Sequence, residues 1–244
     1  MQKGKWFAVL FVLLLLPALA CDVPGEVSIP GVGPAPTATP MGDSISYLIP
    51  LYSYTLKPGE SVPGTRLTYV EREGDMYHVT IDGLAATKRI GDSFIWDGVI
   101  SPGVYAIFNL RITKEVQGEL PVAGPVEVTI FNPQPVEIAE LPTENVELSF
   151  DGILVNYLIP VGREVPGTTL TFAGIRRQGE GSQQVQLAEL SGLSGYNLFA
   201  VGDSLVWRGK LLNHVAVEYG FRVTGISEEG LRLTGDVNLR LLRP

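Results

Sequence analysis

The sequence predicts an all-β protein with two tandem homologous small β-barrel or β-sandwich domains after a signal peptide and a Pro-rich linker. Three observations lead to this prediction. Two stretches of the chain repeat the same motifs in the same order, and many short segments alternate apolar and polar residues with period two. In addition, no segment longer than about ten residues has a convincing helical period.

The repeat is carried by two motifs, Val-Pro-Gly-Thr-x-Leu-Thr and Gly-Asp-Ser-x-x-Trp-x-Gly. They occupy Val62–Thr68 and Val165–Thr171, and Gly91–Gly98 and Gly202–Gly209, respectively. From Gly91 to Pro133 the two copies align at one constant offset, which places Trp96 on Trp207. Chance matches do not keep a single register over such a length. We therefore predict one β-domain over residues 44–135 and a second over residues 136–244.

Each copy is expected to contain about six or seven strands with intervening turns rich in Gly, Asp, Asn and Pro. Asp92 and Asp203 lie in predicted tight turns, where the carboxylate bonds to a backbone N–H. Metal ligation or acid chemistry at these two aspartates is the alternative. Trp96 and Trp207 alternate with polar residues, so we expect them in the core. A glycine follows each tryptophan two residues later and favours a barrel, because strand glycines often mark bends.

The N-terminus predicts a secreted protein. Lys3 and Lys5 precede the apolar run Trp6–Leu16, which is shorter than a membrane span, so residues 1–20 are expected to be a signal peptide. The end of this segment, Ala18-Leu19-Ala20 before Cys21, resembles the lipobox of bacterial lipoproteins. The resemblance covers residues 1–22 and implies that Cys21 carries lipid. The alternative is ordinary cleavage after Ala20, which leaves a free thiol.

A tether is predicted to follow the signal peptide. Residues 21–43 begin with the lipidated cysteine and continue with five prolines and four glycines, a composition typical of an extended linker. A shorter proline-containing joint lies at Asn132–Glu144, within which Val136–Leu141 is expected to form a bridging strand.

Charge and composition restrict the partners. Without residues 1–20 the chain has 16 Lys and Arg against 26 Asp and Glu, a net charge of −10. Such a surface disfavours nucleic acid, so the membrane contact is expected through the lipid on Cys21. The two histidines, His78 and His214, do not occupy equivalent positions, and no zinc, phosphate or nucleophile motif is present. We therefore expect no cofactor, no metal and no catalytic residues.

A candidate contact site comes from a difference between the copies. Tyr-Leu-Ile-Pro occurs at Tyr47–Pro50 and Tyr157–Pro160, and copy one has seven more residues between this motif and its Val-Pro-Gly turn. The extra stretch contains Tyr52 and Tyr54 on one face of a strand. They are a possible contact for an envelope glycan or a protein partner, or else a plain strand pair at the core edge. Copy two has its own extra segment near Arg177–Gln186.

These patterns predict a lipid-anchored extracytoplasmic protein in the bacterial cell envelope, on the outside of the cytoplasmic membrane. Its role is expected to be structural, adhesive or binding. The first alternative is a β-barrel carrier of a small apolar ligand, which requires an interior cavity. The second is a glycan hydrolase, which requires two carboxylates in a groove.

Overall fold

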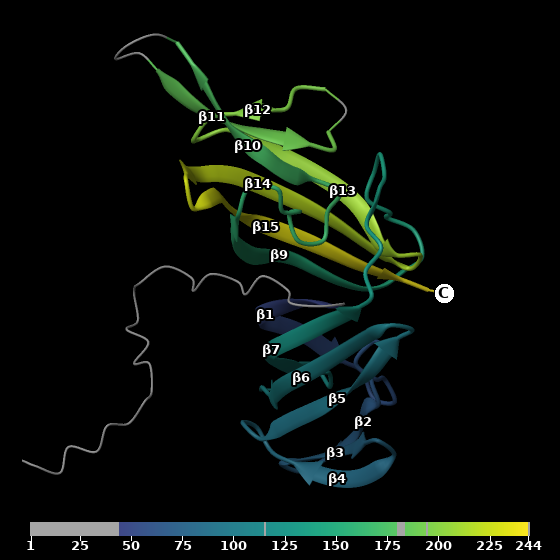
Figure 1. The fold of residues 1–244 in the computed structure, drawn as a ribbon. Coiled ribbons are helices and arrows are strands. Elements are labelled where there is room, and N and C mark those ends of the chain that lie inside the picture. Colours follow the sequence, from purple (N-terminus) through teal and green to yellow (C-terminus); the bar gives the residue numbers. More distant parts are fainter. Residues whose placement is uncertain (1–43, 115, 180–183, 194, 244) are drawn as a thin grey trace, which may run out of the picture. The chain divides into compact units, whose positions relative to one another are not determined.

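The structure is a computed structural model that describes residues 44–114, 116–179, 184–193 and 195–243. Within these residues the chain forms strands and turns, with no helix, and all paired strands are antiparallel (Figure 1). The all-β prediction is therefore confirmed. The predicted signal peptide, Cys21 and the tether lie outside the described residues.

Copy one contributes seven strands to two sheets. One sheet has the order β1-β7-β6-β5 and the other the order β2-β3-β4. The strands are β1 Ser44–Leu56, β2 Leu67–Glu73, β3 Met76–Ile81, β4 Leu84–Lys88, β5 Ser93–Ser101, β6 Val104–Ile112 and β7 Leu120–Phe131.

Copy two repeats this arrangement and adds one strand. Its larger sheet has the order β8-β13-β14-β15-β9, and its smaller sheet has the order β10-β11-β12 (Figure 1). The strands are β8 Val136–Glu137, β9 Val146–Ile159, β10 Thr171–Gln178, β11 Val185–Ser191, β12 Leu198–Phe199, β13 Ser204–Leu212, β14 Val215–Ser227 and β15 Gly230–Leu242. Of the segment Val136–Leu141, where a bridging strand is expected, Val136–Glu137 forms the short strand β8.

The sheets are open and of the β-sandwich type, so the preference for a barrel was wrong. Closure would require β1 to pair with β2 and β4 to pair with β5, and neither pairing is among those of the described strands. After β1 the chain folds back on the start of β2 instead, where the Tyr69 N–H donates to the Glu60 carbonyl at 3.0 Å. The strand glycines do not mark a barrel bend. A Cβ on Gly98 would lie 2.6 Å from Cζ2 of Trp96, so the missing side chain makes room for the indole.

Strand register shows which residues of the copies are equivalent, and it corrects the sequence alignment. Tyr54 pairs with Val122, and Tyr157 pairs with Leu233. Val122 and Leu233 are equivalent at the constant offset that aligns the copies from Gly91 to Pro133. Tyr54 is therefore the counterpart of Tyr157, and the match of Tyr47 with Tyr157 was wrong. In both copies the Val-Pro-Gly turn begins eight residues after the equivalent tyrosine. Copy one has no extra segment here.

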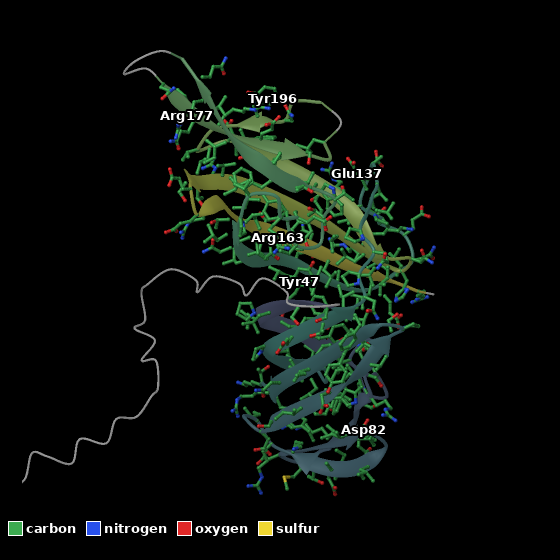
Figure 2. The ribbon with its side chains drawn as sticks, viewed as in Figure 1. Tyr47, Asp82, Glu137, Arg163, Arg177 and Tyr196 are labelled. Carbon is green, nitrogen blue, oxygen red and sulfur yellow. The ribbon has the colours of Figure 1, made fainter. Side chains whose placement is uncertain are left out.

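The real length difference lies in one hairpin of copy two. Tyr69 pairs with Val79, ten residues later, whereas the equivalent Phe172 pairs with Leu190, eighteen residues later. The eight additional residues of copy two therefore lie in the β10–β11 hairpin, at the segment expected near Arg177–Gln186. Arg177 lies in the outer part of this hairpin (Figure 2).

The copies contact one another through buried groups. Tyr47 of β1 and Tyr219 of β14 join their hydroxyls at 2.5 Å, and both rings are buried. The joint between the copies adds a backbone bond from the Gln134 N–H to the Leu211 carbonyl at 2.7 Å. Tyr47 is labelled in Figure 2.

Candidate functional site

Tyr52 does not lie at the surface. Its side chain is 8% exposed, and its ring packs 5.7 Å from Phe108 and 5.6 Å from Phe150. Burial raises the pKa of its hydroxyl well above the usual range. The strand register places it opposite Gly124, as Val155 of copy two lies opposite Gly235. The hypothesis of an exposed tyrosine pair is therefore wrong at Tyr52, which occupies a core position that copy two fills with valine.

Tyr54 holds a turn. Its hydroxyl donates to Oε1 of Glu60 at 2.7 Å, and Oε2 of the same carboxylate accepts the Lys57 N–H at 3.0 Å. This hydrogen bond, followed by burial, raises the pKa of Tyr54 to about 12. Tyr52 and Tyr54 do share one face of β1, but that face packs inward.

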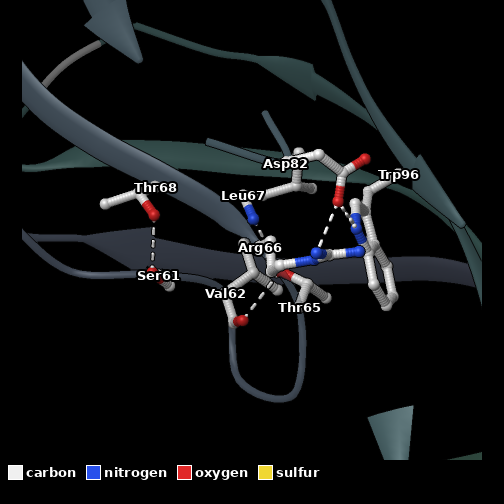
Figure 3. A network of polar contacts seen from close by, with 8 residues as sticks. All are labelled: Ser61, Val62, Thr65, Arg66, Leu67, Thr68, Asp82 and Trp96. Carbon is white, nitrogen blue, oxygen red and sulfur yellow. Dashed lines mark hydrogen bonds and ion pairs between the residues drawn. The ribbon is translucent and has the colours of Figure 1, made fainter. Parts of the chain in front are cut away.

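The repeated motifs also have structural partners. Nε1 of Trp96 donates to Oδ1 of Asp82 at 3.0 Å, and Nε of Arg66 meets the same oxygen at 2.9 Å (Figure 3). In copy two, Nε1 of Trp207 donates to Oγ1 of Thr169 at 3.1 Å instead. Both tryptophans are buried, as predicted. A buried indole N–H requires an acceptor, so each copy supplies one.

The two predicted aspartate turns have the same geometry. Oδ2 of Asp92 accepts the Arg89 N–H and Oδ2 of Asp203 accepts the Ala200 N–H, each at 2.8 Å. Each carboxylate therefore accepts the N–H of the residue three positions earlier in the chain. The described residues contain no group of three or more His, Cys, Asp or Glu side chains suited to a metal ion.

A cleft of about 620 Å³ lies where the copies meet. Its lining includes Ser44 and Ile45 of β1 and the charged pair Arg163 and Glu164 of copy two. Four prolines complete much of its wall, namely Pro133, Pro135, Pro160 and Pro166. Glu164 is the one carboxylate in this lining, whereas the usual glycoside hydrolysis uses two.

The outer face of the larger copy-one sheet carries exposed aliphatic side chains. Leu48 is 62% exposed, Ile95 45%, Val99 67% and Ile107 40%. Register places Leu48, Glu127, Ile107 and Asp97 side by side in one row across the sheet. We define the aliphatic face as the four exposed side chains of Leu48, Ile95, Val99 and Ile107.

Copy two has charges at two of the corresponding positions, whereas the counterpart of Ile95 is Val206, which is 52% exposed. Glu218 is the counterpart of Ile107, and it forms an ion pair with Arg208 and accepts a bond from Asn238. Lys210 is the counterpart of Val99, and the nearby Arg240 pairs with Asp151 at 2.6 Å. Two homologous sheets thus present different outer chemistry.

The edges of the two sheets also differ. In copy two, β8 pairs with β13, so that Gly209 lies opposite Glu137 and Lys210 opposite Val136. Glu137 is labelled in Figure 2. In copy one, β5 pairs with β6 and with no second strand among the described residues. The aliphatic face therefore borders an edge that is open in this part of the chain.

Sequence reasoning missed this site, although its signal was present. The constant offset that holds from Gly91 to Pro133 aligns Val99 with Lys210 and Ile107 with Glu218. Those differences occur on outward positions of strands whose inward positions are apolar in both copies. The sequence alignment instead places the difference in an inserted segment, which the strand register removes.

Comparison with known proteins finds no matching family model, no matching curated protein and no matching solved structure. In the described part of the chain no helix is long and apolar enough to cross a membrane.

Proposed function

We propose that this chain is a lipid-anchored extracytoplasmic binding protein that docks another protein on the aliphatic face of copy one. The observation that carries the proposal is that two outward positions of the copy-one sheet are aliphatic where the homologous sheet of copy two is charged. Ile107 and Val99 are exposed where copy two has Glu218 and Lys210. Exposed apolar patches bordered by polar groups mark interaction surfaces.

A protein partner fits this face better than a glycan. Sugar rings pack against aromatic side chains, whereas the exposed apolar residues here are leucine, isoleucine and valine. Burying aliphatic area stabilises a complex by about 25 cal/mol per Å² before the costs of association. Tyr105 adds one polar group, and its hydroxyl donates to Oδ2 of Asp97 at 2.5 Å.

The alternative of a small-ligand carrier gains no support from the fold. The space between the sheets is filled by large side chains, including Phe94, Phe108 and Trp207. Carriers of apolar ligands need an apolar pocket of several hundred Å³ in that position.

The anchor is proposed from the N-terminal sequence. A lipid on Cys21 would hold the acidic chain at the outer surface of the cytoplasmic membrane or in the cell envelope. Cys21→Ser should release the protein from the membrane fraction and abolish incorporation of labelled palmitate. A variant that stays membrane-bound with unchanged processing would exclude the lipid anchor.

The docking face is tested by photocrosslinking in intact cells. A benzophenone amino acid is introduced at Ile107 in one variant and at Glu218 in the other. We expect an adduct with one defined protein from position 107 and little from position 218. The adduct should disappear when Ile95 and Val99 are both changed to Ser. Equal crosslinking from the two positions, or an adduct that survives those changes, would contradict the proposal.

A further inference from the structure

We infer that β5 of copy one binds its partner by strand addition, accepting an extended segment that alternates apolar and basic side chains. This inference rests on the proposed function and specifies the docking mode. The carrying observation is that the homologous strand β13 already binds an added strand from this same chain.

The interaction of β8 with β13 defines the geometry. Ile138 donates its N–H to the Arg208 carbonyl at 3.0 Å, and Val136 lies opposite Lys210 in antiparallel register. Prolines flank the added segment at Pro133, Pro135 and Pro142. A short extended stretch is therefore sufficient to occupy this edge.

Strand β5 has the same backbone frame. Ser93 pairs with Arg111 as Ser204 pairs with Arg222, and Asp97 is the counterpart of Arg208. In antiparallel sheets the backbone groups of alternate residues point to the same side of a strand. The carbonyl of Asp97 and the N–H of Val99 therefore face outward, where exposed strand edges recruit further strands.

The side chains specify the occupant. On its outer face β5 presents Ile95, Asp97 and Val99, all exposed, in the order apolar, acidic, apolar. A strand lying beside them places its own side chains directly opposite, where opposite charges and aliphatic pairs are favourable. The fitting segment therefore has an apolar residue, then Lys or Arg, then an apolar residue, at every second position.

Self-pairing fits less well. Two β5 strands joined antiparallel about Asp97 would place two carboxylates opposite each other, which is unfavourable. The same strand thus disfavours a second copy and favours a basic partner segment.

The test uses a labelled peptide derived from residues 134–140. The peptide QPVEKAI keeps that backbone pattern, with lysine opposite Asp97 and isoleucine opposite Ile95. Its binding to the full-length chain in nonionic detergent is followed by fluorescence anisotropy. We expect saturable binding. The affinity should fall at least tenfold when the backbone amide nitrogen of the peptide's lysine residue is methylated. The methylated peptide keeps its charge and apolarity but loses the N–H for the Asp97 carbonyl.

Three protein variants complete the design. Asp97→Lys should weaken binding of QPVEKAI several-fold and favour the matched peptide QPVEEAI, which carries glutamate opposite position 97. Val99→Pro removes an outward N–H and should abolish binding, while Val99→Thr should retain it. Melting curves check that each variant is folded, and the methylated peptide tests the unaltered protein in any case.

The outcomes separate the inference from the proposed function. Equal binding of the methylated and unmethylated peptides would overturn strand addition. If crosslinking from position 107 is nevertheless intact, the proposed docking on the aliphatic face would still stand. Binding that appears only after residues 22–43 are deleted would show that the chain covers its own edge and overturn the partner assignment. A dimer by sedimentation that Val99→Pro dissociates would assign the edge to a second copy. Absence of binding to all forms would also overturn the inference.

Discussion

A tryptophan and a glycine act together at the same place in each copy. The indoles of Trp96 and Trp207 lie over Gly98 and Gly209, which share their face of the strand. A side chain at either glycine would enter the space of the ring. The repeated Trp-x-Gly therefore reflects steric packing inside the sandwich rather than chemistry at a site.

Gly98→Ala should lower the free energy of unfolding by about 1–3 kcal/mol, the usual cost of overpacking. In a Trp96→Phe background the smaller ring should reduce this cost, giving a coupling of about 0.5–3 kcal/mol in a double-mutant cycle. Urea unfolding of the four proteins measures both values. Gly225→Ala is the control, because its Cβ would lie at an ordinary 3.5 Å from Arg232. Equal costs at Gly98 and Gly225 would contradict the steric account.

Three buried tyrosines make the protein sensitive to alkali. Burial raises the pKa values of Tyr47 and Tyr219 well above the ordinary value, and charge on a neighbouring tyrosine would raise them further. The hydrogen bond between them lowers that of Tyr47 and raises that of Tyr219. Burial also raises the pKa of Tyr157. The folded state therefore holds these protons more tightly than the unfolded state.

The contribution of these tyrosines to the free energy of unfolding should accordingly be constant up to about pH 10 and fall as pH rises toward the folded pKa values. The double variant Tyr47→Phe, Tyr219→Phe should lose less stability between about pH 9 and pH 11. Urea midpoints across this range measure the difference. A parallel decline in the two proteins would show that other groups cause the alkaline unfolding.

Strands and turns were largely predictable because their patterns are local. Alternation around Trp96 and Trp207 located β5 and β13, and the glycine–aspartate turns appear where the motif placed them. The alignment of Tyr47 with Tyr157 was wrong because it relied on the shared motif Tyr-Leu-Ile-Pro. The true equivalence follows from strand register, which depends on partners distant in the sequence. The barrel preference failed for a related reason, since pairing between sheets is not encoded in either strand alone.

The β10–β11 hairpin is the element in which copy two is longer, and its extension should be dispensable for folding. Replacing residues 177–186 by the Gly74-Asp75 turn of copy one restores the shorter length. Arg177 and Gln186 are exposed, so we expect stability within about 1 kcal/mol of the parent. Circular dichroism and thermal melting measure the outcome. Loss of cooperative melting would mean that the hairpin supports the sheet below it.

The two copies are not independent modules joined only by a linker, because they also contact one another directly. The hydroxyl bond between Tyr47 and Tyr219 and the contact of Tyr52 with Phe150 cross from one copy to the other. Independent folding of residues 44–135 and 144–244 remains a prediction. We expect both fragments to melt below the tandem, and a fragment from residue 132 to melt above one from residue 144 because it retains β8. Calorimetry of the tandem and the three fragments measures these differences.

The two homologous copies share one fold but differ at one sheet edge and on the outer face of the larger sheet. Copy two has β8 at its sheet edge and two ion pairs, Arg208–Glu218 and Arg240–Asp151, on its outer face, whereas copy one has the aliphatic face beside β5. Inward residues are apolar in both copies because the core constrains them, and outward residues are free to differ. The candidate site was therefore not predictable from either copy alone, but required their comparison in the correct register.

Hydrogen exchange at two equivalent backbone amides tests this account most directly. In the full-length chain without partner, the Val99 amide on the outer edge of β5 should exchange rapidly. The Lys210 amide on β13 pairs with β8, and it should exchange at least about tenfold more slowly than the Val99 amide. Added QPVEKAI should slow exchange at Val99 and leave Lys210 unchanged. Equal protection of the two amides before any addition would contradict an open edge in copy one and, with it, the proposed site.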